Sequence, residues 1–271
     1  MDLIGELGIA VVLGAIGVLG LRPLLPKLRR LQPGDTAAQG FGLWVIGFLV
    51  FHLAGAGLAL WLVPEALDGE SPLPISRLMP IQALSSLLAV GILLLAAGRL
   101  RVEREELGLR AHRGPSALVV AVCAWLAFYP VFVLVALVNA ELQGLFGNEL
   151  SPQQYLQDFL ADEQARSSPL VWAIMVVVLP TCEELLFRGA LYGGLRRVLH
   201  PVAAVGISAL LFGVAHGNVT TLLLPVAALG VALALLYERT ASLTTPILFH
   251  ALHNGLTLAL ATFTSQLEPA A

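Results

Sequence analysis

The stretch that decides the fold of this chain is PTCEELLFR, from Pro180 to Arg188, inside an apolar run from Leu170 to Tyr192. The run is as long as a membrane-spanning helix of about 20 residues, yet it holds two carboxylates and a guanidinium. A charged side chain at the centre of a bilayer costs about 3 kcal/mol or more, so such groups face a bundle interior and are usually functional. The stretch therefore predicts a membrane-embedded functional site.

Helical spacing separates the three charged side chains of this stretch. Glu184 and Arg188 are four residues apart, so they share one face and can neutralise each other. Glu183 is turned about 100° away from Glu184. We therefore expect Glu184 and Arg188 to pair and Glu183 to remain available for chemistry.

The composition places the whole chain in a membrane. Hydrophobic residues make up 58% of it and charged residues 12%, against about 25% charged in soluble domains, and the mean hydropathy is +0.85. Cys123 and Cys182 both lie in apolar runs, so no disulfide framework is predicted. The net charge of -3 and the lack of a basic patch with interleaved aromatic residues give no indication of a nucleic-acid partner.

Apolar stretches of span length recur along the chain and predict an all-α polytopic bundle of about eight transmembrane helices. We treat residues 1–271 as a single domain, with a four-span part over residues 1–140 and a core over residues 170–262. The predicted spans are Leu3 to Leu21, Phe41 to Val63, Met79 to Ala97, Ser116 to Leu137, Leu170 to Tyr192, Val202 to Asn218, Thr220 to Tyr237 and Thr245 to Thr262.

Basic residues predict the orientation, because cytoplasmic loops retain Lys and Arg. Most of them follow the first, third, fifth and seventh spans, whereas the opposite loops carry only Arg77 and Arg166 and many acidic residues. The acidic start of the chain, with Asp2 and Glu6, is unlike a secretory signal, so the first span is expected to be retained. Both termini are then outside, in what we expect to be a prokaryotic inner membrane.

A short amphipathic helix is predicted before the fifth span. Ser151 can cap it and Pro152 suits its first turn, and an apolar stripe follows at helical spacing, made of Tyr155, Leu156, Phe159 and Leu160. This helix either packs on the bundle or covers a substrate entrance at the membrane surface.

The remaining polar groups within the spans cluster near the C-terminus of the chain. His216 falls in the sixth predicted span, and His250 and Asn254 fall in the eighth. A rise of 1.5 Å per residue gives depths from the cytoplasmic side of about 20 Å for Glu183 and His216, about 18 Å for Asn254 and about 12 Å for His250. Three helices are thus expected to bring a carboxylate, two imidazoles and an amide to similar levels.

These residues form three motifs that resemble those of a known family. Glu183-Glu184-x-x-x-Arg188, Phe212-x-x-x-His216 and His250-x-x-x-Asn254 occur in this order on separate spans. They are similar to the EExxxR, FxxxH and HxxxN motifs of the CAAX protease and bacteriocin-processing (CPBP) intramembrane proteases, also called the Abi or type II CAAX prenyl endopeptidase family. The resemblance covers about Leu170 to Thr262.

The resemblance implies a role for each motif residue. Glu183 and His216 would activate a water, His250 and Asn254 would lie near the carbonyl oxygen under attack, and Glu184 with Arg188 would form an orienting pair. Chemistry permits these roles, because a partly desolvated carboxylate is a better general base and two donors one helical turn apart can hold an oxyanion. A purely structural ion pair remains the alternative for Glu184 and Arg188.

The resemblance also raises the question of a metal. Members are usually described as metalloproteases, and Glu183, His216 and His250 would supply a zinc ion with a two-His, one-carboxylate set. The sequence has no HExxH motif, and a metal-free mechanism with a glutamate-activated water is the alternative. Both stay open, as does whether His253 lines the site, while Cys182 is expected to be a small buried hydrophobe.

The expected activity is hydrolysis of membrane-associated or lipidated peptides, with prenylation of the substrate left open. Two other classes of function compete with it. Buried Glu and His can relay protons or bind a cation in a transporter or channel, and a family fold can persist as a catalytically silent scaffold. Retention of every motif residue argues against the scaffold.

The orientation can be measured directly. A reporter fused after Arg110 is expected to behave as cytoplasmic and one fused after Ala271 as external, because of the arginine distribution. A C-terminal reporter found inside would show that one of the last four predicted spans does not cross the membrane.

Overall fold

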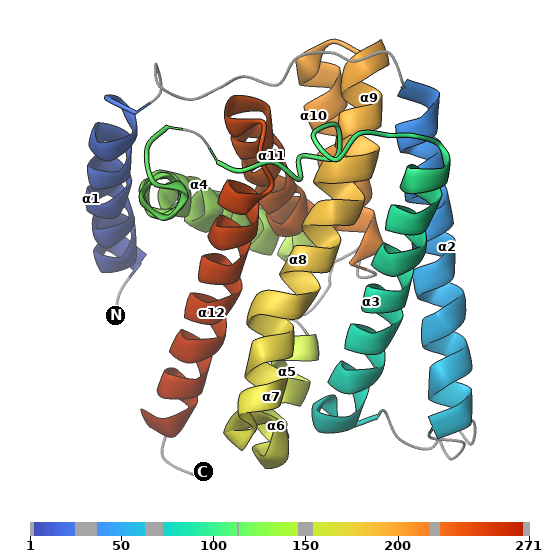
Figure 1. Ribbon diagram of the computed structural model, residues 1–271. Coiled ribbons are helices and arrows are strands. Elements are labelled where there is room, and N and C mark those ends of the chain that lie inside the picture. The colour runs from blue at the N-terminus through green and yellow to red at the C-terminus, as the bar shows by residue number, and fades with distance from the viewer. Residues whose placement is uncertain are drawn as a thin grey trace.

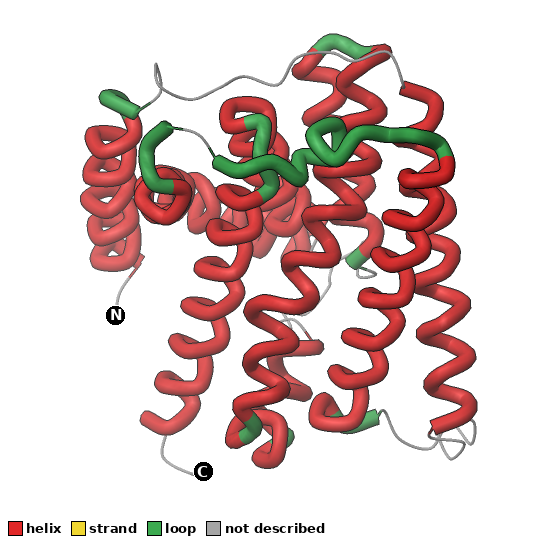
Figure 2. The backbone as a smooth tube through the Cα atoms, in the orientation of Figure 1, coloured by secondary structure: helices red, strands yellow, loops and turns green. Residues whose placement is uncertain are grey.

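The computed structural model describes residues 3–24, 37–62, 73–112, 114–145, 154–216 and 223–267 (Figure 1). Within these ranges the regular structure is entirely helical, without a strand (Figure 2). The predicted all-α, polytopic bundle is confirmed. Five of its helices are long and apolar enough to cross a membrane, and shorter apolar helices accompany them.

Each predicted span has a helix. The helices are α1 (Leu3–Leu21), α2 (Ala37–Leu62), α3 (Ile75–Arg99), α4 (Ala117–Leu145), α10 (Pro201–Ala215), α11 (Leu223–Thr240), α12 (Thr244–Leu267) and one long helix from Pro169 to Val198. That long helix, called here the central helix, is made of α7 (Pro169–Ala173), η3 (Ile174–Val178), α8 (Leu179–Glu184), η4 (Leu185–Tyr192) and α9 (Gly193–Val198).

Several helix ends differ from the predicted span ends. The central helix continues to Val198 and α12 to Leu267, beyond the predicted ends at Tyr192 and Thr262. α4 continues to Leu145, beyond the predicted end at Leu137, and Asn139 and Gln143 are buried in this extension. α10 ends at Ala215, whereas its span was predicted to reach Asn218. Asn218 and the predicted start of the next span, Thr220, lie outside the described residues.

The central helix lies between α12 and α3 in Figure 1. Its apolar side chains form the middle of the main hydrophobic core, where Leu186, Phe187 and Leu191 pack with Phe212 of α10 and Phe249 of α12. A charged stretch is therefore surrounded by packed apolar helices, as its position in an apolar run predicts.

Close contact between α1 and α4 depends on a glycine. A Cβ added at Gly17 would overlap the backbone of Cys123 and Ala127 in α4. Small residues allow membrane helices to approach closely and gain packing contacts. Gly17 thus joins α1 to the bundle.

The predicted amphipathic helix is α5 (Gln154–Ala161), followed by α6 (Glu163–Ser167). Phe159 is fully buried and its ring meets that of Trp172 edge-on at 5.7 Å. Met79 and Met175 belong to the same apolar cluster. These contacts support the packing interpretation of this helix; Ser151 and Pro152 lie outside the described residues.

The segment after α3 is attached to α9 and to the connection between α11 and α12 at one end of the bundle. Glu106 pairs with Arg197 at 2.6 Å, the Gly108 carbonyl accepts from the Leu243 backbone N–H at 3.1 Å, and Ser242 Oγ donates to the Arg110 carbonyl at 3.1 Å. In Figure 1 this segment crosses the upper part of the central helix. The segments with most of the arginines therefore meet at one end, and their cytoplasmic location remains a prediction.

At the opposite end of the bundle, Asp162 links α6 to the first turn of α3. Its carboxylate accepts from the Ala165 backbone N–H at 3.0 Å, which caps α6, and from the Ser76 backbone N–H at 2.8 Å in the first turn of α3. Partial burial by itself raises the pKa of this carboxyl, but these backbone donors outweigh it and hold the pKa below the usual value. The ionised form therefore stabilises the fold.

Asp162→Ala is expected to lower the free energy of unfolding by about 1 kcal/mol at neutral pH, since a helix cap is lost. The contribution of Asp162 is present above the ordinary carboxyl pKa and is lost as pH falls through its lowered folded value. Thermal unfolding in detergent at pH 7 and near pH 3 measures this, with Asp162→Asn as the capping-competent control. A difference from wild type that stays constant with pH would contradict it.

Candidate active site

The Glu184–Arg188 ion pair is the buried centre of the site. Glu184 Oε1 and Arg188 Nη1 are 3.0 Å apart, and both side chains are fully buried. The predicted pairing is confirmed. Although Arg188 lies in the π-helical segment η4, the helix remains continuous, and π turns of this kind are frequent at functional sites.

Two further helices contact Arg188. Its Nη2 donates to the Gly230 carbonyl of α11 at 3.2 Å, and its guanidinium lies 4.2 Å from the Phe212 ring centroid of α10, a cation–π contact. A Cβ at Gly230 would lie 2.9 Å from the Ala209 Cα. The absence of a side chain at Gly230 therefore lets α10 and α11 close around the guanidinium.

Glu184 also holds a histidine. His250 Nδ1 lies 3.0 Å from Glu184 Oε1, the same oxygen that Arg188 contacts. An ionised carboxylate only accepts hydrogen bonds, so His250 Nδ1 carries a proton and donates it to this bond. Glu184 thereby fixes the orientation of the His250 ring and directs Nε2 to the other side.

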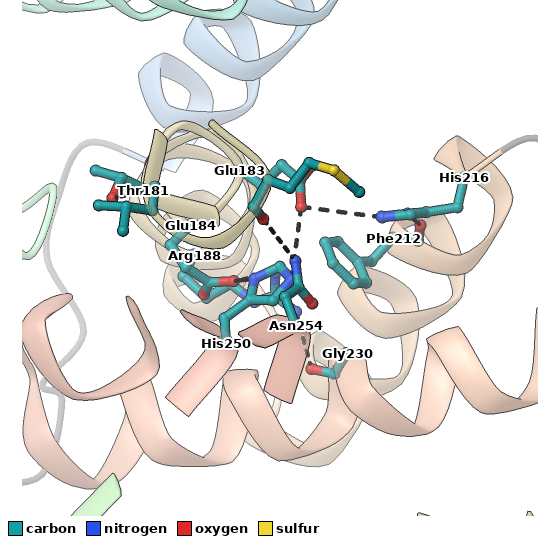
Figure 3. Close-up of polar contacts among 11 residues, drawn as sticks. Thr181, Glu183, Glu184, Arg188, Phe212, His216, Gly230, His250 and Asn254 are labelled. Carbon is teal, nitrogen blue, oxygen red and sulfur yellow. Dashed lines mark hydrogen bonds and ion pairs between the residues drawn. The ribbon is translucent and has the colours of Figure 1, made fainter. Parts of the chain in front are cut away.

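That other nitrogen faces Glu183. Glu183 Oε2 lies 3.8 Å from His250 Nε2 and 3.9 Å from His216 Nε2 (Figure 3). Glu183 and His216 are about one-third exposed, at 29% and 34%, whereas His250 is buried. The structure thus brings the three side chains together from the central helix, α10 and α12, at an accessible place.

His216 follows the last residue of α10 instead of lying inside a longer helix. Its Nδ1 is 2.7 Å from the Phe212 carbonyl, which only accepts, so Nδ1 carries the proton. Phe212 is fully buried, as expected for a residue that packs in the core at the wall of the site. The helix end directs the free Nε2 of His216 toward Glu183.

Asn254 and His253 follow His250 on α12 but make different contacts. Asn254 Nδ2 donates to the Met175 carbonyl of η3 at 3.1 Å. The His253 ring packs edge-on against Phe132 of α4 at 4.9 Å. Cys182 is buried in the hydrophobic core, as predicted for a small hydrophobe.

Two site contacts were not predicted from the sequence, because both use backbone carbonyls. Gly230 and Met175 contribute their carbonyl oxygens to Arg188 and Asn254. No side-chain motif marks such groups. The signals available were a glycine within an apolar helix, and a proline five residues after Met175 that cannot donate to a preceding carbonyl.

Within the described ranges, no group of three His, Cys, Asp or Glu side chains has the geometry of a metal site. The 3.8 and 3.9 Å separations from Glu183 to the two imidazoles exceed the spacing of about 3.4 Å that follows from tetrahedral zinc with bonds near 2.0–2.2 Å. By their donor atoms, Glu183, His216 and His250 still match the two-His, one-carboxylate set that binds zinc.

Residues 165–256 match the family model described as type II CAAX prenyl endopeptidase Rce1-like. Over these residues the chain is similar to that family. The predicted resemblance to the CPBP family is confirmed, and every motif residue from Glu183 to Asn254 lies inside the matched range. No curated protein and no solved structure matches the chain significantly.

At the level of the family, the match indicates a CAAX-type intramembrane protease, and hence a hydrolase whose peptide substrate lies at the membrane. The apolar helices agree with an integral membrane protein. The α1 to α4 helices precede the matched range.

The ion pair and Glu183 are expected to respond differently to mutation. Arg188→Ala or Glu184→Ala leaves one fully buried charge unpaired, which costs about 3–5 kcal/mol. Glu183→Ala removes a partly exposed side chain and should leave stability unchanged or slightly raised. Thermal denaturation of the three variants in detergent measures this, and a Glu183→Ala variant that is the least stable of the three would reverse the assignment.

Proposed function

We propose that the protein cleaves peptide bonds of membrane-associated substrates with a water activated by Glu183 and His216. The observation that carries this proposal is the convergence of Glu183 Oε2 with the Nε2 atoms of His216 and His250, at 3.9 and 3.8 Å. The match to a CAAX-type endopeptidase family supports the reaction class.

The positions of the protons on the two imidazoles explain why a water fits between these atoms. Both imidazoles use their Nδ1 protons elsewhere, on the Phe212 carbonyl and on Glu184. In a neutral His216 ring Nε2 is therefore an acceptor, like the Glu183 carboxylate. The distances from Glu183 are too long for direct hydrogen bonds, and a water that donates to Glu183 and His216 fits between acceptors of this kind.

The reaction then has a defined course. Glu183 accepts a proton from the water as the water oxygen bonds to the substrate carbonyl carbon, with His216 holding the second hydrogen. The C–N bond breaks, and the proton held by Glu183 passes to the amine that leaves. The chain itself supplies the base and the acid at one position, accessible to solvent and substrate.

His250 and Asn254 are proposed to hold the oxyanion. For this role His250 carries a proton on Nε2 as well as on Nδ1, and the Glu184 carboxylate accepts the Nδ1 proton in a hydrogen bond. The charges of Glu183, Glu184, Arg188 and His250 then sum to zero, which favours burial of the cluster. Asn254 adds a neutral donor one helical turn away.

A metal-dependent form of the mechanism uses the same residues. A divalent ion such as zinc would be held by Glu183, His216 and His250, and when bound it would polarise the carbonyl and lower the pKa of a coordinated water. His250 would then be neutral, and Glu184 would act as the carboxylate that orients a metal-bound imidazole. Both forms depend on Glu183 and on the Glu184–His250 contact.

Loss of Glu183, His216 or His250 is expected to abolish cleavage while the protein stays folded. Single Ala variants of these residues should each lose nearly all turnover, and combining them should add little because they act as a unit. Asn254→Ala should lose about 100- to 1,000-fold in kcat. The measurement is cleavage in proteoliposomes of a fluorogenic CAAX peptide with a farnesylated cysteine, beside the same peptide without the lipid.

Glu141→Ala, which alters an exposed glutamate of α4, is the matched control and should cleave like wild type. Chelator-induced loss of activity and of thermal stability in wild type, absent in His216→Ala, would select the metal-dependent form. Near wild-type cleavage by Glu183→Ala would overturn the proposal. Proton or cation flux that depends on Glu183, without any cleavage, would select a transporter instead.

A further inference from the structure

The hydrogen-bond register of the central helix changes directly before the catalytic motif. The Leu179 backbone N–H donates to the Ile174 carbonyl, five residues earlier, in the π-helical segment η3. In that register the next donor is the N–H of residue 180, and its acceptor is the Met175 carbonyl. Residue 180 is proline, which has no N–H. The Met175 carbonyl is therefore left without its helical donor.

Another helix supplies the missing donor. Asn254 Nδ2 of α12 donates to the Met175 carbonyl at 3.1 Å. Met175 and Pro180 are both buried, so a carbonyl without a partner would be destabilising there. The side chain of Asn254 thus takes the place of a backbone N–H.

This bond also fixes the orientation of the Asn254 amide. The carboxamide has two N–H donors on one side and an acceptor oxygen on the other. Turning it over would place Oδ1 against the Met175 oxygen, and two acceptors repel. One N–H is therefore held by Met175 while the second keeps a fixed direction, beside Glu183 and His250 (Figure 3).

We propose that Pro180 and Met175 are positioning residues: by withholding an N–H, Pro180 frees the Met175 carbonyl to orient Asn254 for oxyanion binding. This inference rests on the proposed function for the role of Asn254, but the Met175–Asn254 bond does not. The effect of Pro180 thus passes through one side chain of α12.

A stability cycle tests the bond without any substrate. Asn254→Ala is expected to lower Tm by about 2–4 °C, because the Met175 carbonyl loses its partner. Adding Pro180→Ala restores an N–H that can bond to Met175, so it should raise Tm more in the Asn254→Ala background than in wild type. Pro80→Ala, at an exposed proline inside α3, is the matched control and should change Tm equally in both backgrounds.

An activity cycle tests the consequence, with the fluorogenic peptides described above as probes. Pro180→Ala should lower kcat by about 10- to 100-fold with KM unchanged, because the new N–H competes for Met175 and releases the Asn254 amide. In the Asn254→Ala background it should cause no further loss. Asn254→Asp, which has the same shape without the donor, should behave like Asn254→Ala.

Three outcomes separate this inference from the proposed function. Equal Tm gains from Pro180→Ala in both backgrounds would overturn the positioning role, as would an equal fall in kcat in both. A Glu183→Ala variant that cleaves normally would overturn the proposed function alone, since the stability cycle does not involve cleavage. The inference holds if Tm coupling and the loss of kcat both require Asn254.

Discussion

The buried ion pair between Glu184 and Arg188 is the interaction on which the rest of the structure depends. Both side chains are fully buried within an apolar bundle, where desolvation of each charge must be offset by close partners. Phe212, Gly230 and His250 supply these partners from three helices. Satisfying one pair of charges therefore brings α10, α11 and α12 to the same side of the central helix.

This arrangement also gives two adjacent glutamates different surroundings. Glu184 is fully buried and touches Arg188 and His250, whereas Glu183 is 29% exposed and faces two imidazole nitrogens. Among the described residues, Glu184 Oε2 and Arg188 Nε have no hydrogen-bond partner. A bundle selected only for stability would avoid such groups, so their retention is consistent with a site that is kept for chemistry.

Much of this was predictable from the sequence, because hydropathy and local spacing are short-range properties. The apolar stretches predicted the helices, and the i,i+4 rule predicted the Glu184–Arg188 pair even though Arg188 lies in a π-helical segment. The three motifs, in order, predicted the family. The end of α4 was less accurate, because hydropathy does not register polar residues, here Asn139 and Gln143, that are buried by tertiary contacts.

The sequence by itself thus determined the bundle, the family resemblance and the set of candidate residues. Only the tertiary structure decided how these residues meet: His250 with Glu184, Asn254 with the Met175 carbonyl, and His253 with Phe132. The physical reason is that periodicity gives the face of a helix but not its rotation against its neighbours. Packing at Gly230 and the π register before Pro180 set that rotation, and both act through backbone atoms.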